Sequence, residues 1–214
     1  FSRGAARSEG EYLEGIDGLL AKSVTEQLVS DVPLGLLLSG GIDSSAALYY
    51  MSRALKEPVK TFTIGYGPKD ASFNETAGAR LLAGHFKTEH HEAFLEPDVR
   101  STMEKLAAQF DEPFADASAI PTYLVTGEAR KKVTVALTGI GGDELFGGYP
   151  RHLGARLLPG YMKLPAQARK WLWAAARHMP ESASSFNTPG RIKRFMKGGL
   201  GDFRSGYESW TSYF

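Results

Sequence analysis

The chain contains no cysteine among its 214 residues. Disulfides, thiolate metal sites and a cysteine nucleophile are therefore excluded within it, and the absence suits a cytoplasmic protein. No apolar run approaches the roughly 18 residues of a membrane-spanning helix, so we expect no membrane partner. The first residues, Phe1-Ser2-Arg3-Gly4, include no methionine and form no apolar signal segment. We interpret the chain as a processed form or an excerpt of a longer protein.

Basic residues are scarce early in the chain and acidic residues are scarce late in it. Residues 1–150 hold 14 Lys and Arg against 21 Asp and Glu, a net charge of −7, whereas residues 151–214 hold 11 against 3, a net charge of +8. Such a basic segment could attract nucleic acid or a nucleotide. It contains no nucleic-acid-binding motif. We therefore interpret it as a helical region with acidic neighbours elsewhere, and expect no nucleic-acid partner.

Strand-like and helix-like segments alternate over the first 140 residues. Strands are expected over 34–38, where an apolar run indicates burial on both faces, over 59–64 and 132–137, and as a short strand within 85–94. Helices are expected over 11–29, 44–55, 73–84 (capped by Ser72 with Glu75), 97–110 and 118–131. The alternation predicts an α/β fold with a doubly wound parallel sheet and right-handed crossovers.

The pattern changes after Pro150. A helix is expected over 161–179, a polar linker over 180–190 and a short basic helix over 191–197, before an aromatic-rich end. We expect a core domain over 1–150, and over 151–214 a helical extension of that domain that is incomplete in this chain.

The segment Ser39-Gly40-Gly41-Ile42-Asp43-Ser44-Ser45 follows the first expected strand. Ligands of open α/β sheets bind beyond the carboxyl ends of the strands. The two glycines let the backbone approach a phosphate, the next helix presents its N-terminus, and the three serines add hydroxyl donors. Asp43 suits such an anion site only with a cation such as Mg²⁺ between carboxylate and phosphate. The alternative is a glycine turn with a helix cap, and the segment lacks the Gly-Lys-Ser/Thr of a Walker A loop.

A second glycine-rich segment runs from Thr138 to Tyr149 after the fourth expected strand, so we expect it beside the first loop. Five of its twelve residues are glycine, and Asp143 is a candidate second Mg²⁺ ligand. The alternative is that Asp143 and Glu144 form a capping pair at the start of a helix.

The first segment resembles the pyrophosphate loop of the N-type ATP pyrophosphatases. The second resembles the synthetase domain of the asparagine synthetase (glutamine-hydrolysing) family. So do Ser30-Asp31-Val32-Pro33, Phe73-Asn74-Glu75, His90-His91-Glu92 and the segment 111–116, and the resemblance covers about residues 10 to 152. It implies an adenine nucleotide alpha hydrolase-like, Rossmann-like fold with additional C-terminal helices. The implied enzyme adenylates the side-chain carboxylate of aspartate with ATP, after which ammonia displaces AMP.

The resemblance also implies residue roles. The implied pyrophosphate and Mg²⁺ contacts are Ser39, Gly40, Gly41, Asp43 and Ser44, beside Ser45; the implied adenosine and AMP contacts are Leu38, Ile64, Thr138 and Gly139; and the second Mg²⁺ ligand is Asp143. A family lysine that contacts pyrophosphate is expected beyond Phe214. The implied partners are ATP, an aspartate-like carboxylate, ammonia and a glutaminase domain with a leading cysteine, absent here and expected in the parent protein. A homodimer is also compatible with the family.

One position departs from the family. Ile140 stands where an acidic residue usually follows the Thr-Gly pair, and isoleucine can do no proton chemistry. The departure leaves three functions open: an asparagine synthetase-type ligase, a related amidotransferase with another acceptor, or a nucleotide-binding pseudoenzyme.

Three further groups receive structural interpretations. His90 and His91 are neighbours on an expected strand, so their side chains point to opposite faces and do not share a metal ion. Trp171 and Trp173 are interpreted as core or domain contacts. The acids Asp111, Glu112 and Asp116 are interpreted as loop acids, with a place in the substrate pocket as the alternative.

Overall fold

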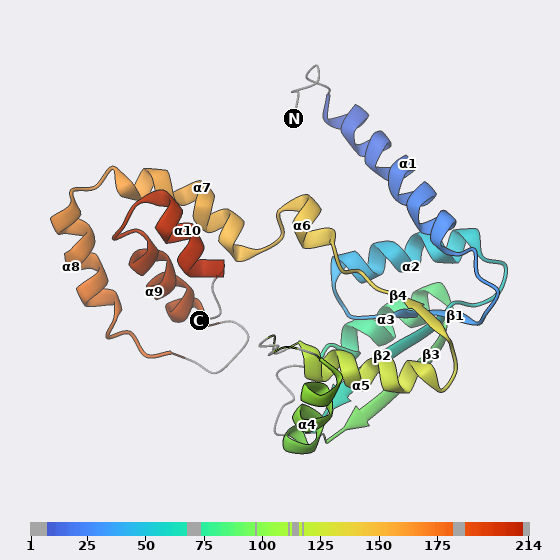
Figure 1. Ribbon diagram of the computed structural model, residues 1–214. Helices are drawn as coiled ribbons and strands as arrows, with labels where there is room; N and C mark the ends of the chain where they lie inside the picture. The colour runs from blue at the N-terminus through green and yellow to red at the C-terminus, as the bar shows by residue number, and fades with distance from the viewer. Residues whose placement is uncertain are drawn as a thin grey trace. The chain divides into compact units, whose positions relative to one another are not determined.

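The computed structural model describes residues 8–67, 74–96, 98–110, 112, 116, 118–181 and 187–211. It divides into two compact units, Phe1–Ile140 and Gly141–Phe214. The described elements of the first unit are helices α1 (Glu9–Gln27), α2 (Ile42–Ala54), α3 (Thr76–Phe86), α4 (Val99–Gln109) and α5 (Ala119–Arg130), and strands β1 (Leu34–Leu37), β2 (Lys60–Tyr66), β3 (Glu89–Leu95) and β4 (Val135–Leu137) (Figure 1). The assignment of 1–150 and 151–214 as a core and its extension stays a prediction.

The sheet of the first unit is parallel throughout, in the order β3-β2-β1-β4. The chain builds outward from β1 through β2 to β3, and then returns to place β4 on the other side of β1. Strand order therefore reverses between β1 and β4, and ligands of open α/β sheets bind at the carboxyl ends of the strands at such a switch point. Both loops predicted to bind nucleotide leave the sheet here, since one follows β1 and the other follows β4.

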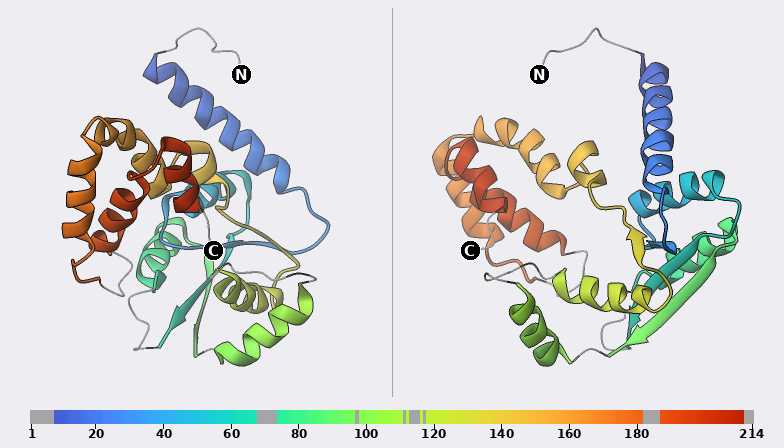
Figure 2. Two further views of the ribbon diagram at one scale, coloured as in Figure 1. Left: turned by 60° about the vertical axis from the view of Figure 1, so that its left-hand side comes forward. Right: turned by 45° about the vertical axis from the view of Figure 1, so that its right-hand side comes forward.

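Helices cover both faces of this sheet (Figure 2). Leu36 packs in a buried cluster with side chains of α2 and α3. Its neighbour Leu37 packs beside Phe62 and beside Ala129 of α5 in a second cluster. Because successive side chains of a strand point to opposite faces, the two clusters lie on opposite sides of the sheet. The predicted α/β class with a doubly wound parallel sheet is confirmed.

The start of α3 differs from the prediction. A helix was expected from residue 73 with a Ser72 cap, but α3 begins at Thr76 after Glu75, which makes no side-chain capping bond. Ser72 and Phe73 lie outside the described residues. The Asn74 amide instead pairs with the end of β2, where its Oδ1 accepts from the Tyr66 N–H at 2.6 Å and its Nδ2 donates to the Tyr66 carbonyl at 3.0 Å. Asn74 thus extends the hydrogen bonding of the strand and delays the helix.

The second unit is helical over its described part. Its elements are α6 (Gly142–Phe146), α7 (Pro150–Met162), α8 (Ala166–Ala176), α9 (Thr188–Gly198) and α10 (Phe203–Thr211). The single helix expected over 161–179 is wrong, because the chain breaks between α7 and α8 at Pro165, whose ring cannot continue a helix. Trp171 is 68% exposed and lies outside the core of its unit. Throughout the described ranges, every helix is too short or too polar to cross a bilayer.

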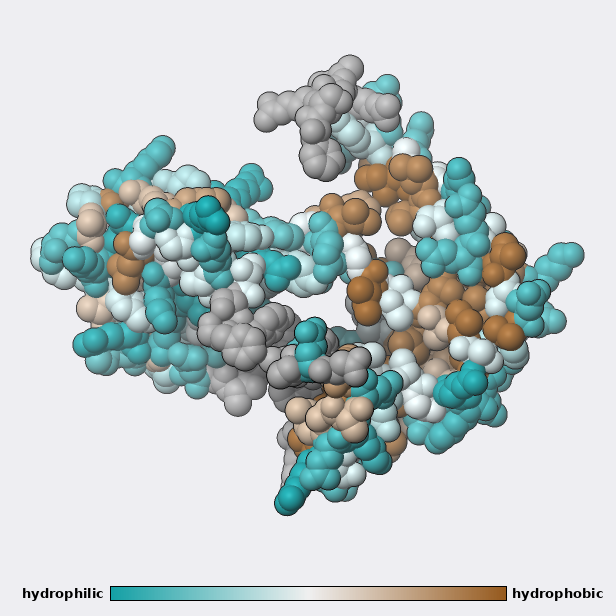
Figure 3. Space-filling view, in the orientation of Figure 1, coloured by the Kyte–Doolittle hydropathy of each residue, from teal (hydrophilic) through white to brown (hydrophobic). Residues whose placement is uncertain are grey.

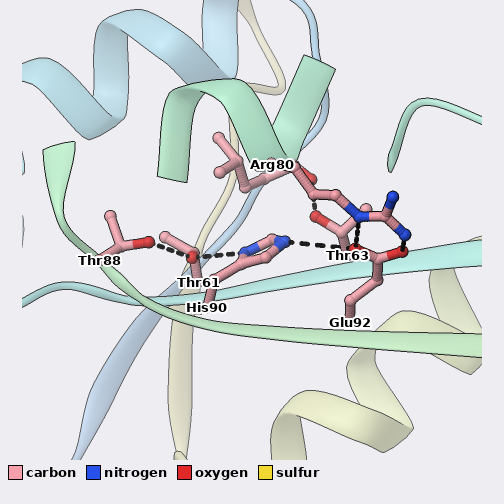
Figure 4. Close-up of polar contacts among 7 residues, drawn as sticks. Thr61, Thr63, Arg80, Thr88, His90 and Glu92 are labelled. Carbon is pink, nitrogen blue, oxygen red and sulfur yellow. Dashed lines mark hydrogen bonds and ion pairs between the residues drawn. The ribbon is translucent and has the colours of Figure 1, made fainter. Parts of the chain in front are cut away.

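His90 and His91 lie on opposite faces of β3, as expected. His90 Nδ1 lies 2.9 Å from the Thr61 hydroxyl, whereas the His91 ring stacks on Phe62 with centroids 5.2 Å apart. On the His90 side, Arg80 donates two hydrogen bonds of 2.6 Å to Glu92, and Glu92 Oε2 lies 3.9 Å from His90 Nε2 (Figure 4). His90 is therefore a half-buried member of a polar cluster between α3 and the sheet.

We expect His90 to make the fold less stable in acid. Burial lowers the pKa of His90 by more than the neighbouring Glu92 raises it. As the pH falls, His90 therefore takes up its proton in the unfolded chain before it does so in the folded chain. The free energy of unfolding then falls as the pH drops below about 6.5, the pKa in the unfolded chain, and stops falling below the lower pKa of the folded chain. In His90→Gln, chemical denaturation at a series of pH values should show a smaller loss of unfolding free energy. His178→Gln, at an exposed histidine, is the control, and an undiminished pH dependence in His90→Gln would contradict the assignment.

Candidate functional site

The residue before the phosphate loop is held by β2 through both of its backbone groups. The Leu38 N–H donates to the Phe62 carbonyl at 2.8 Å, and the Thr63 hydroxyl donates to the Leu38 carbonyl. Leu38 and Thr63 are both buried. The loop therefore leaves the sheet from a fixed point. Thr63 was not singled out from the sequence, although a hydroxyl on an otherwise apolar buried strand is a signal that could have found it.

Within the loop, the serine side chains bond to the loop itself. The hydroxyls of Ser39 and Ser44 lie 2.8 Å apart, and the Ser39 N–H donates to Ser44 Oγ at 3.2 Å. The Gly41 N–H donates to Ser39 Oγ at 3.1 Å, and Ser45 Oγ donates to the Gly41 carbonyl at 2.6 Å. These bonds close the turn before α2. The structure thus shows the three serines stabilising the loop, and their role as pyrophosphate ligands stays a prediction.

The end of β4 brings Gly139 against the first turn of α2. A Cβ atom at Gly139 would lie 2.6 Å from the Ser44 backbone nitrogen and 2.9 Å from the Asp43 Cβ. The beginning of the second glycine-rich segment thus lies beside the phosphate loop, as expected. Because Gly139 has no side chain, the end of β4 can lie in direct contact with the N-terminal turn of α2. The glycine-rich loop and the N-terminus of α2, which Gly41 caps without a side-chain hydrogen bond, supply backbone N–H groups of the kind that suit a phosphate.

Helix α3 approaches the loop from the other side. A Cβ atom at Gly78 would lie 2.8 Å from the Gly40 Cα, and one at Gly40 would lie 3.1 Å from the Gly78 Cα. Two glycine backbones are therefore in direct contact between α3 and the loop. Gly78 was not recognised from the sequence, since a single glycine in a helix gives no signal of its partner.

We expect Gly78→Ala to weaken ATP binding roughly tenfold, about 1.4 kcal/mol. The added methyl group must displace the backbone of Gly40 and with it the loop. Isothermal titration calorimetry with ATP measures the effect. Gly84→Ala is the matched control, because the same helix has nothing within 4 Å of a Cβ at Gly84. Equal ATP affinities of the two variants would show that the loop tolerates the shift.

Two cavities border this region. One, of about 570 Å³, is lined by Leu38, Ser39 and Ile64, and its size suits a small-molecule ligand. The other, of about 870 Å³, is lined by Thr138 and Ile140 beside β4 and α5. The predicted adenosine contacts Leu38 and Ile64 therefore share one cavity, and Thr138 lies in the other. Ile140 is 85% exposed, and its N–H donates to Thr138 Oγ1 at 3.3 Å.

The two predicted magnesium ligands belong to different units. Asp43 is half-buried in the first turn of α2, and Asp143 lies in the first turn of α6. Helix α6 is capped by Gly141, without a side-chain capping bond, so Asp143 and Glu144 do not act as its N-cap. The Tyr149 hydroxyl donates to Glu144, and this bond is the main reason that the pKa of Glu144 is lowered. Carboxylate oxygens suit Mg²⁺, and the metal role of both aspartates stays a prediction.

One of the acids over 111–116 makes a local hydrogen bond. Within the described ranges, no three His, Asp or Glu side chains are grouped closely enough to hold a metal ion. Asp116 Oδ1 accepts from the Ser118 N–H at 2.8 Å, as the interpretation of a loop acid expects. Asp111 lies outside the described residues.

The chain is similar to several named proteins. A structure of the NH3-dependent NAD synthetase from Campylobacter jejuni matches 64% of this chain and 60% of its own, with 22% identity and a TM-score of 0.41. Bacillus subtilis asparagine synthetase (glutamine-hydrolyzing) 1 is 36% identical over 174 residues, which are 81% of this chain and 27% of that protein. A Methanocaldococcus jannaschii protein provisionally named as a glutamine-hydrolyzing asparagine synthetase is 42% identical over 149 residues, which are 69% of this chain and 28% of that protein.

The chain thus spans about a quarter of the length of these curated relatives. The sequence profile of the family described as asparagine synthase matches residues 15–200, which include both glycine-rich segments. The chain belongs to the asparagine synthase family.

Proposed function

We propose that the chain is the ATP-binding part of an asparagine synthetase-type ligase. Such a ligase adenylates the side-chain carboxylate of aspartate, or of a related acid, and then forms an amide with ammonia. The observation that carries the proposal is the contact of Gly139 with the first turn of α2, which brings the two glycine-rich segments together at the N-terminus of that helix. The size of the cavity beside Leu38 and Ile64 supports the nucleotide as the ligand.

In this proposal, the wall formed by Leu38 and Ile64 holds adenosine, and the α2 N-terminus with the loop holds the β and γ phosphates. Asp43 and Asp143 would hold Mg²⁺, which supplies positive charge to the leaving pyrophosphate when it is bound. A carboxylate oxygen of the acceptor attacks the α-phosphorus and pyrophosphate leaves. The nitrogen of ammonia then attacks the acyl carbon, AMP leaves, and the surplus proton passes to solvent.

The source of ammonia and the assembly state are part of the same proposal. A glutaminase domain of the parent protein would supply ammonia, and the homodimer is tested by sedimentation of that protein. We place the enzyme in the cytoplasm, which fractionation of cells tests. These points rest on the family and not on contacts within this chain.

The decisive experiment measures pyrophosphate release by the intact parent protein with ATP, Mg²⁺ and an ammonium salt. We expect release that depends on an added carboxylate substrate, with aspartate tested first. Mass spectrometry of the product identifies the acceptor. If no amino acid tested leads to pyrophosphate release, the ligase function is rejected, and a nucleotide-binding protein without catalytic activity is the remaining function.

Ile140 favours a second candidate function, an amidotransferase with a different acceptor. If the acceptor is aspartate, Ile140→Asp should raise the rate of asparagine formation tenfold or more, since general acid–base catalysis contributes about 10²–10⁴-fold. ATP affinity should stay unchanged, because the Ile140 side chain is 85% exposed. Ile140→Asn is the matched control, similar in size to Asp but without a titrating group. A wild-type protein that makes another amide, and that gains no asparagine formation from Ile140→Asp, would establish the second function.

A further inference from the structure

The second unit carries a positive charge that the nucleotide site does not use. Residues 141–214 hold 11 Lys and Arg against 5 Asp and Glu, a net charge of +6. The visible face of α7 to α10 is mainly hydrophilic (Figure 3). Three of the arginines, Arg151, Arg191 and Arg194, line one cavity of about 350 Å³ between the start of α7, helix α9 and the end of α10. Basic side chains from two helices therefore gather around one space.

Two other residues that line this cavity, Phe195 and Trp210, are aromatic and packed in place. The Trp210 indole N–H donates to the Arg194 carbonyl at 2.9 Å, and the indole stacks on Phe195 with centroids 5.9 Å apart and planes at 22°. A Cβ atom at Gly154 would lie 3.0 Å from the Trp210 ring, and one at Gly198 would lie 2.6 Å from its nitrogen. The indole is thus held between α7 and α9, and this aromatic wall is part of the packing of the unit.

The acids near the arginines are engaged with other groups. Glu181 accepts a hydrogen bond from Lys193 at 2.7 Å, and Glu144 accepts one from the Tyr149 hydroxyl. The Arg151 guanidinium carbon lies 3.8 Å from the centroid of the Tyr149 ring. In the described part of the unit, no carboxylate forms an ion pair within 4.0 Å of Arg151 or of Arg194. Glu144 interacts electrostatically with Arg151, and Glu181 with Arg194, so these carboxylates reduce the positive charge at the cavity without forming a direct ion pair with either arginine.

We propose that this cavity binds a phosphorylated small molecule. Guanidinium groups bind phosphate through paired N–H donors, and three of them around one cavity suit an anion of charge −2 or more. Trp210 and Phe195 offer an apolar face to the group that carries the phosphate. A cavity of about 350 Å³ lies at the small end of ligand sites and fits a sugar phosphate or a mononucleotide. All of its lining residues belong to the second unit, so the site shares no residue with the loop at Ser39 to Ser45.

Trp210 provides a local probe for the test. The chain has three tryptophans, so Trp171→Phe with Trp173→Phe leaves Trp210 as the only indole. The full 214-residue chain with this background is titrated with pyrophosphate and with AMP at constant ionic strength. We expect a saturable change of fluorescence with both, and tighter binding of AMP if its ring meets the aromatic wall. If pyrophosphate binds and AMP does not, the cavity is still an anion site, and its ligand is a phosphate compound without a base.

Substitutions of the arginines that line the cavity test the proposal. Arg191→Gln combined with Arg194→Gln should weaken the binding of pyrophosphate and of AMP at least tenfold. Arg151→Gln should weaken it as well, and because Arg151 lies on α7, this variant tests the cavity even if the double substitution disturbs α9. Arg156→Gln, at an exposed arginine of α7 outside the cavity, is the matched control. Unchanged affinity in the cavity variants would overturn the proposal. So would loss of the signal in Gly139→Ala, which would assign the response to the ATP site, or tighter, strongly salt-dependent binding of oligothymidylate, which would assign the surface to nucleic acid.

Discussion

Gly139→Ala is expected to abolish ATP binding, with a loss of affinity of at least a hundredfold, about 2.7 kcal/mol. The new methyl group would lie 2.6 Å from the Ser44 nitrogen and 2.9 Å from the Asp43 Cβ. No methyl group fits at that distance, so either β4 or the first turn of α2 must move. That turn presents the N-terminal amides to which we assign the phosphates. The steric conflict therefore acts on the ligand through the position of these amides.

Isothermal titration calorimetry with ATP and Mg²⁺ measures this loss. Gly127→Ala is the matched control, because a Cβ at Gly127 on α5 meets nothing within 4 Å. Circular dichroism of both variants separates a local effect from unfolding. If Gly139→Ala folds and binds ATP as tightly as Gly127→Ala, the nucleotide does not bind at the start of α2 and the proposed function loses its main support.

Leu36→Ala is expected to lower the free energy of unfolding by about 3 kcal/mol, within the range of 2–5 kcal/mol for such changes. Leu36 is fully buried on β1, which pairs with β2 on one side and β4 on the other. Its side chain packs in the cluster formed with α2 and α3, where close neighbours prevent the cavity from collapsing. A loss of this size is a large part of the stability of an ordinary domain.

Urea denaturation followed by circular dichroism measures the change. Leu81→Ala on α3 is the control, since Leu81 is 72% exposed and its truncation should change the free energy by less than about 0.5 kcal/mol. Equal destabilisation by the two substitutions would show that β1 is not at the centre of the core. Such a result would also contradict our conclusion that the phosphate loop leaves the sheet from a fixed point.

The existence of most elements could be predicted from local patterns. The apolar run before Ser39 predicted a strand buried on both faces, and β1 is such a strand between two others. Predictions were wrong where a side chain acts on a distant backbone or where proline interrupts a pattern. Asn74 pairs with Tyr66 and postpones α3, and Pro165 separates α7 from α8. Helix α10 was missed, because its aromatic residues serve contacts with α7 and α9 that no local pattern reveals.

The sequence by itself determined the chemistry at the strand end: glycines that admit an anion, an acid that calls for a cation, and motifs that assign the chain to its family. It could not determine which segments touch. Only the tertiary structure decided that Gly139 lies against Asp43 and Ser44, and that Gly78 lies against Gly40. It also decided that arginines from α7 and α9 share one cavity. The physical reason is that composition and periodicity describe neighbours along the chain, whereas these contacts depend on strand order and helix packing between residues far apart in it.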